Sequence, residues 1–246
     1  MRKHLSVLGL WATGTLHWVL GLLAVSAGAE LALFRYRMSR PAAELPEILD
    51  VLVQESGLMT VCMAAFLLLG VLLSVSGCAL QGSRVEYTLR RLAVREEMAV
   101  VWKAVYSLFC LLLFWAVQVG VMLLVCRWYK ASLPEMYVSE QTVFLAVYRI
   151  DFFHGLLPLD NWLVWLRNAV VLLTLSLATA CFSYRQRRGK FSIVPILEMP
   201  VVLLCFNGGV RESETHTLLI VVCLFLAIFD LWDLIYRWRG GTEDEA

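Results

Sequence analysis

Charged residues are scarce in this chain of 246 residues. Only 17% of its residues are Asp, Glu, Lys or Arg, whereas 60% are hydrophobic; soluble globular domains average about 25% charged and about 45–50% apolar residues. This apolar composition excludes an intrinsically disordered protein, because the chain has enough apolar surface to collapse. The 21 basic residues are balanced by 20 acidic ones, which leaves no surplus of positive charge for nucleic acid. The composition therefore predicts a membrane protein that does not bind nucleic acid.

The sequence also lacks the motifs of several chemical sites. Its seven cysteines form no Cys-x-x-Cys pair, and we expect them to pack against neighbouring helices. There is no His-Glu-x-x-His motif, and Gly189-Lys190 is followed by Phe191 rather than by the Ser or Thr of a phosphate-binding loop. We therefore expect no catalytic, metal or cofactor site in this chain, which on this reading is not an enzyme.

Long apolar runs are present instead, and a run of about 20 such residues is enough to cross a bilayer. Three runs contain no charged residue, and three more carry isolated charges. The fifth run contains Pro195 and Pro200, so it either crosses the membrane or forms a kinked or re-entrant element. We predict an all-α, polytopic membrane protein in a single domain, 1–246. The six predicted spans cover about 5–29, 57–82, 103–126, 161–184, 191–208 and 215–236.

The basic residues of the loops predict the orientation. If both termini are cytoplasmic, 13 Lys and Arg residues lie on the inner side and 8 on the outer side, as the positive-inside rule requires. The densest basic run, residues 185–190, follows the fourth span and would face the inner leaflet. A basic cluster at residues 35–40 is an exception to this bias. We expect the first run, at 25 residues too long for the apolar part of a signal peptide, to be retained as a span. The predicted location is the cell (inner) membrane, with both termini cytoplasmic.

The loop between the second and third spans has a helical pattern of its own. Val85, Leu89 and Leu92 recur at i, i+4 and i+7, while the arginines fall elsewhere on the helical wheel. This pattern predicts an amphipathic helix over about 84–95. Its apolar stripe could lie on lipid or fit a groove of a soluble protein. Acidic residues among the arginines argue against simple adhesion to anionic lipid.

The same loop reads Tyr-Thr-Leu-Arg-Arg-Leu at residues 87–92 and Ala-Val-Arg-Glu at residues 93–96, and Trp102-Lys103 opens the third span. This pattern resembles the loop of type-two ABC exporter permeases, in which T-L-x-x-L is followed by a small or proline residue and a charged helix start. The resemblance extends to the length of about 250 residues, the six spans, the cytoplasmic ends and the lack of a fused ATPase. In that family the loop is the coupling helix.

The resemblance implies that this chain is the membrane subunit of an ATP-driven exporter, forming the translocation path. A separate ATP-binding subunit would hold ATP and Mg²⁺ and dock on the coupling helix. A second permease chain, identical or related, would complete the path within the lipid bilayer. The residues expected to contact the ATP-binding subunit are Arg84, Val85, Tyr87, Leu89, Arg90 and Leu92.

Charged residues within spans are costly, by about 2.5–3.5 kcal/mol each at mid-helix, and so become functional hypotheses. Glu198 in the fifth span either lines the translocation path, pairs with Arg167, or caps a broken helix. Asp230 and Asp233 share one face of the sixth span near Arg237, and we expect them to form an interfacial, salt-bridged anchor.

Two other functions remain open at this stage. The chain could be a non-transporting membrane scaffold or sensor whose cytoplasmic helix binds another partner. A proton-coupled carrier would require Glu198 to titrate. Association with an ATP-binding cassette protein distinguishes the exporter from both.

Overall fold

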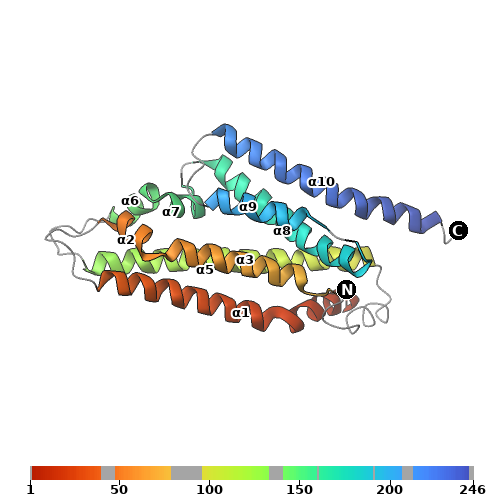
Figure 1. Cartoon of the computed structure of the whole chain (residues 1–246), viewed down its shortest axis with the longest axis horizontal. Coiled ribbons are helices and arrows are strands. Elements are labelled where there is room, and N and C mark those ends of the chain that lie inside the picture. The colour runs from red at the N-terminus through yellow and green to blue at the C-terminus, as the bar shows by residue number, and fades with distance from the viewer. Residues whose placement is uncertain are drawn as a thin grey trace.

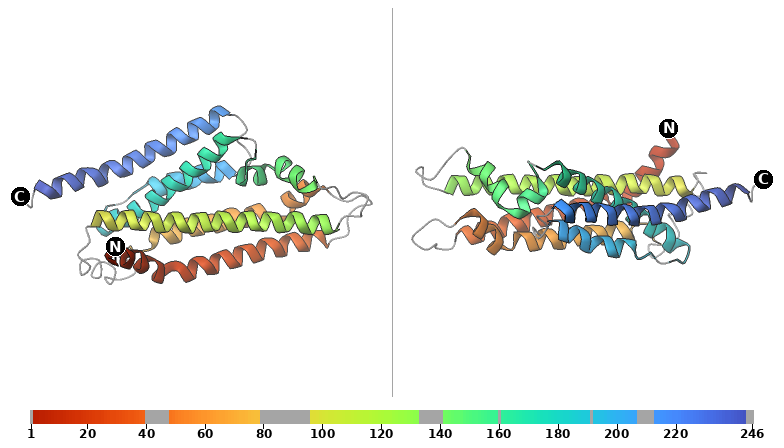
Figure 2. Two further views of the ribbon diagram at one scale, coloured as in Figure 1. Left: turned by 180° about the vertical axis from the view of Figure 1, so that it is seen from behind. Right: turned by 90° about the horizontal axis from the view of Figure 1, so that it is seen from above.

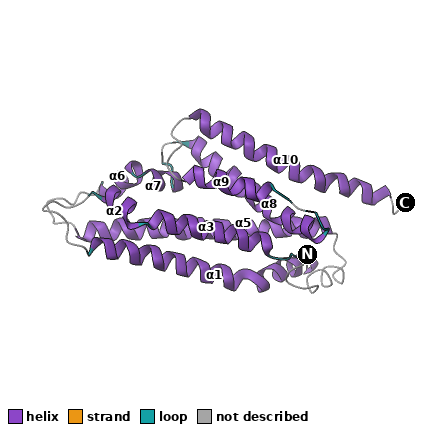
Figure 3. Ribbon diagram, viewed as in Figure 1, coloured by secondary structure: helices purple, strands orange, loops and turns teal. Residues whose placement is uncertain are grey.

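The structure is a computed structural model that describes residues 2–39, 48–78, 96–132, 141–159, 161–190, 192–206 and 213–243. Every regular element in these ranges is an α-helix (Figure 3). The helices are α1 (Arg2–Met38), α2 (Leu49–Ser56), α3 (Leu58–Val75), α5 (Glu96–Ser132), α6 (Thr142–Arg149), α7 (Asp151–Leu156), α8 (Trp162–Arg187), α9 (Val194–Phe206) and α10 (Ser213–Glu243).

Five of these helices are long and apolar enough to cross a membrane, namely α1, α3, α5, α8 and α10. The remaining predicted span, the fifth, corresponds to α9, which is apolar but has only 13 residues. Such a helix extends about 20 Å, which is less than the hydrocarbon thickness of about 30 Å. The predicted all-α class is confirmed for the described residues, and five predicted spans coincide with full-length helices.

The long helices form an elongated bundle in which the chain reverses direction from α1 to α3, from α3 to α5 and from α5 to α8 (Figure 1). Helix α10 runs in the same direction as α8, because the shorter α9 runs back between them. Helix α8 packs against both α5 and α10, and so joins the α1–α3–α5 half to the α9–α10 half (Figures 1 and 2). We call one end of the bundle the terminal end. Helices α1 and α5 begin there, and helices α3, α8 and α10 end there. The short helices α2, α6 and α7 lie at the opposite end, the capped end (Figure 1).

Apolar side chains cover the outside of the bundle as well as its interior. Leu69 on α3 and Leu111 on α5 are buried, whereas Val71 on α3, Phe109 on α5 and Leu173 on α8 are each more than half exposed. A helix that is apolar on all faces belongs in a membrane or a large core, and so many exposed apolar side chains are not compatible with water. The chain therefore belongs to the class of multi-pass membrane proteins.

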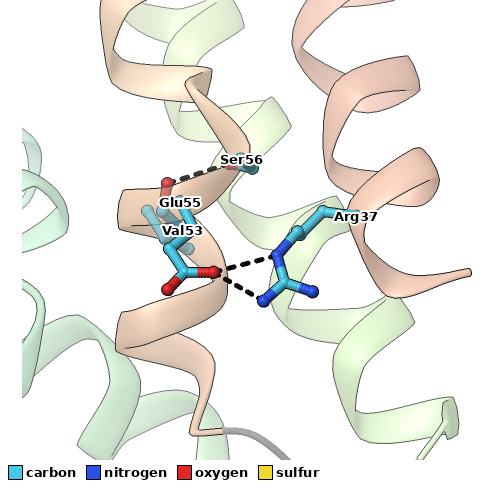
Figure 4. Close-up of polar contacts among 4 residues, drawn as sticks. All are labelled: Arg37, Val53, Glu55 and Ser56. Carbon is cyan, nitrogen blue, oxygen red and sulfur yellow. Dashed lines mark hydrogen bonds and ion pairs between the residues drawn. The ribbon is translucent and has the colours of Figure 1, made fainter. Parts of the chain in front are cut away.

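The capped end accounts for the basic cluster that opposes the charge bias. Arg37 on α1 donates from Nε and Nη2 to Glu55 Oε2 on α2, at 3.1 and 2.5 Å (Figure 4). Ser56 donates to the carbonyl of Val53 in the last turn of α2, at 2.8 Å. The guanidinium of Arg35 lies 5.7 Å from the centre of a tryptophan ring on α5. Two arginines of the cluster are thus held by structural contacts.

Candidate functional site

A buried lysine joins the helix ends that flank residues 79–95. Lys103 lies two turns into α5 and is only 1% exposed. Its ammonium donates to the carbonyl of Ser76 at the end of α3 and to Ser183 Oγ on α8, the latter at 2.6 Å. The same ammonium lies 5.2 Å from the centre of the Trp11 ring on α1, within cation–π range. Lys103 therefore connects four of the five long apolar helices at the terminal end.

Gly77 holds the end of α3 against the same tryptophan. Its φ of +79° lies in the left-handed region that favours glycine, and a Cβ at this position would lie 2.3 Å from the Trp11 ring. Nearby, the hydroxyls of Thr15 on α1 and Tyr106 on α5 are hydrogen-bonded at 2.7 Å. The turn that precedes residues 79–95 is thus fixed to α1 by close contact.

An ion pair holds the other side of this segment. Glu96, the first residue of α5, accepts a hydrogen bond of 2.5 Å from Arg188 Nη2, just after α8. The Arg188 guanidinium also lies 4.5 Å from the centre of the Tyr184 ring. Burial lowers the pKa of Arg188, but the hydrogen bond with Glu96 and the neighbouring charges together raise the pKa by more. This guanidinium therefore stays charged, and the described residues on both sides of 79–95 are held by contacts with other helices.

A second ionic group connects α8 to the α9–α10 half at the same end. Arg185 Nη1 lies 3.0 Å from Asp230 Oδ1 on α10 and donates to Ser192 Oγ, just before α9, at 3.0 Å. The predicted salt bridge of Asp230 is present, but its partner is Arg185. Asp230 is 1% exposed within the bundle, and its place at the membrane interface stays a prediction. The side chains of Asp233 and Arg237 lie outside the described residues.

Glu198 lies in the interior beside this ion pair. Helix α9 continues through Pro200, so Glu198 is inside a helix and does not cap a broken one. Its side chain is 1% exposed, and neither carboxylate oxygen has a hydrogen-bond partner among the described residues. Asp230 and Thr174 are its polar neighbours. A carboxylate so placed is costly to bury, and this cost marks Glu198 as a functional candidate.

Arg167 does not pair with Glu198, so that predicted alternative is wrong. The guanidinium is buried near the capped end, where Nη2 donates to Asn168 Oδ1 at 2.9 Å and Nη1 lies 3.1 Å from His216 Nδ1 on α10. Asn168 donates in turn to the carbonyl of Gly155 on α7, at 2.8 Å. Arg167 thus belongs to a separate polar group that joins α7, α8 and α10.

The residues predicted to contact an ATP-binding subunit lie outside the described residues. They are Arg84, Val85, Tyr87, Leu89, Arg90 and Leu92. The structure instead describes what flanks them: the Gly77 turn, the Glu96–Arg188 ion pair and the buried Lys103. These flanking groups, which we call the junction, form the candidate functional site.

Sequence reasoning missed the junction because its partners are far apart in the chain. Lys103 is 27 residues from Ser76 and 80 residues from Ser183, and no periodicity within one helix connects them. The available signal was a lysine beside a long apolar run, which is costly in a bilayer unless it has partners.

The fold and the junction together define a multi-pass helical membrane protein with buried ionic groups at its terminal end. No family model, no curated protein and no solved structure matches the chain. Its function is therefore inferred from the arrangement of its own residues.

Proposed function

We propose that this chain is the membrane subunit of an ATP-driven exporter of the ABC type, and that residues 84–95 dock a separate ATP-binding subunit. The junction is the observation that carries the proposal. A coupling element must be attached firmly to the helices that it moves, and residues 79–95 are flanked on both sides by residues tied to other helices. ATP and Mg²⁺ would be bound in the partner subunit.

The contacts provide a route by which movement at the docking segment reaches the whole bundle. A displacement of the start of α5 is passed through Lys103 to α1, α3 and α8. The Arg185–Asp230 pair and Ser192 then connect α8 to α10 and to the start of α9. Packed helices joined in this way shift as rigid bodies between discrete arrangements. In the proposed mechanism, such a shift alternates the access of the path to the two sides.

The proposal includes six membrane crossings, with α9 as the fifth, in the cell (inner) membrane. With α9 counted, the termini lie on one side, in agreement with their position at one end of the bundle (Figure 1). The basic run at residues 185–190 lies at that end, which favours the cytoplasm there. Glu198 would line the translocation path, and a second permease chain would complete it.

Association with an ATP-binding partner tests the proposal. The first observation is whether the neighbouring reading frame encodes an ATP-binding cassette protein. The chain is then co-expressed with that protein, and co-purification and ATP hydrolysis are measured. We expect the two to co-purify, and expect L89D/L92D to abolish both the association and any stimulation of hydrolysis. The matched control is I48D/V51D, which places the same charges on residues of α2 and its cap that are 62% and 40% exposed, at the capped end. The control should retain both properties.

Two results would contradict the exporter. If the chain instead retains a partner that is not an ATPase, the scaffold or sensor function is correct. If association with the ATPase survives L89D/L92D, residues 84–95 are not the docking element. Glu198→Gln tests the carrier alternative, because proton-coupled transport requires an ionisable group at this position; transport that is unchanged in this variant excludes it.

A further inference from the structure

A groove opens on the outside of the bundle near the terminal end, between the start of α9 and α10. Its volume is about 560 Å³, within the range of about 300–1,000 Å³ found for ligand sites. One wall is formed by Phe225, Phe229 and Trp232 of α10, which recur at i, i+4 and i+7 and are each more than half exposed. Ile193 and Leu197 form the facing wall. This wall of α10 extends about 10 Å along the helix axis.

The groove is apolar along its length and basic at one end. Arg185, Lys190 and Ser192 line the end that lies toward the start of α9, and none of the described lining residues is acidic. Arg185 is matched by Asp230 behind it, whereas Lys190 is exposed and forms no ion pair with a described residue. Among the described residues, the groove therefore offers one positive charge without an acidic partner, next to an aromatic, apolar channel.

This combination matches one class of ligand. An acyl chain fits an apolar channel that is open to the bilayer, while a phosphodiester is attracted by a basic residue at the level of the headgroups. Tryptophan at that level suits the boundary between chain and headgroup. A soluble phosphate compound would leave the aromatic wall uncovered, and a neutral lipid would leave Lys190 unmatched.

We propose that this groove is a binding site for an anionic phospholipid of the leaflet at the terminal end. The phosphate lies at Lys190, and one acyl chain runs along Trp232, Phe229 and Phe225 toward the middle of the bundle. Because Arg185 lines the groove and also pairs with Asp230, a bound lipid contacts the ionic group that connects α8 to α10. This site does not depend on the exporter assignment.

Quenching of Trp232 fluorescence by brominated lipid tests the proposal. The full chain is reconstituted in phosphatidylcholine vesicles that contain a small fraction of a lipid with brominated chains. In one series the brominated lipid is phosphatidylglycerol, and in the other it is phosphatidylcholine. The fluorescence of Trp232 is obtained by subtracting the fluorescence of the Trp232→Phe variant from that of the wild type. We expect phosphatidylglycerol to quench this signal at lower mole fraction. Lys190→Gln should weaken the preference about fivefold, the effect of one basic residue at an anionic surface.

Lys130→Gln is the matched control, because Lys130 lies at the far end of α5, and it should retain the preference. Leu197→Trp, measured by native mass spectrometry, fills the groove and should lower the number of phosphatidylglycerol molecules retained per chain. Equal quenching by the two lipids, equal effects of Lys190→Gln and Lys130→Gln, or unchanged retention in Leu197→Trp would overturn the proposal. So would displacement of the lipid by glycerol 3-phosphate, since a soluble phosphate ester would then be the ligand.

Discussion

Replacing Gly77 by alanine should destabilise the bundle more than the same change at another glycine with the same backbone conformation. Gly77 has φ +79° and Gly57 has φ +74°, so both substitutions place a Cβ in the left-handed region. That conformation costs about 1–2 kcal/mol for a residue with a Cβ. At Gly57 the new atom has nothing within 4 Å, whereas at Gly77 it lies 2.3 Å from the Trp11 ring.

The contact with Trp11 determines the difference between the two variants. Trp11 is 4% exposed, so its ring has little room to move. Overpacking of this kind costs about 1–3 kcal/mol. The expected loss of unfolding free energy is therefore about 2–5 kcal/mol for Gly77→Ala and about 1–2 kcal/mol for Gly57→Ala.

Denaturant unfolding of the purified chain in detergent, followed by tryptophan fluorescence, measures both variants. Trp11→Leu provides an internal check, because a smaller side chain leaves space for the new methyl group. In that background Gly77→Ala should cost only the backbone part, which gives a coupling energy of about 1–3 kcal/mol in a double-mutant cycle. Equal losses at Gly77 and Gly57, or no coupling to Trp11, would refute the close contact between the end of α3 and α1.

Four further variants test the ionic groups. Asp230→Asn leaves the buried Arg185 without this carboxylate and should destabilise the bundle by about 3–5 kcal/mol. The double variant with Arg185→Met and Asp230→Leu should lose less stability, because no charge is left unpaired. The unfolding free energies of the two variants are compared. Reversal of the Glu96–Arg188 pair should change stability by less than about 1 kcal/mol, because both side chains are more than one-third exposed. Lys103→Met should be tolerated within about 2 kcal/mol, as loss of a buried charge offsets the lost hydrogen bonds, and a larger fall in the unfolding midpoint would contradict this.

The positions of the long helices follow from the sequence, but their ends do not. The first span was predicted over 5–29 because Glu30 follows, yet α1 continues to Met38. Glu30 is fully buried and accepts a hydrogen bond of 3.0 Å from Gln118 on α5. In the same way α5 begins at Glu96, before the predicted start at residue 103. A charged residue ends an apolar run in the sequence without ending the helix, because a partner on another helix satisfies it.

The polar partners could not be predicted for a related reason. Helical periodicity relates residues three or four positions apart, whereas Arg185 and Asp230 belong to different helices that meet only in the folded bundle. The pattern did identify Glu198 and Asp230 as unusual charges. It did not show that they are neighbours or that Arg167 lies elsewhere, with His216.

A docking segment must hold its partner and must also transmit the partner's movement to the bundle. Different residues of this chain would perform these two steps. Leu89 lies in the segment that would contact the partner, whereas Lys103 is buried two turns inside α5 and has no access to it. If the exporter proposal is correct, Leu89→Asp should abolish association with the ATP-binding subunit. Lys103→Met should leave association intact but remove the stimulation of ATP hydrolysis, because the contacts from α5 to α3 and α8 are lost. A Lys103→Met complex with normal stimulation would mean that movement enters the bundle by a route other than the junction.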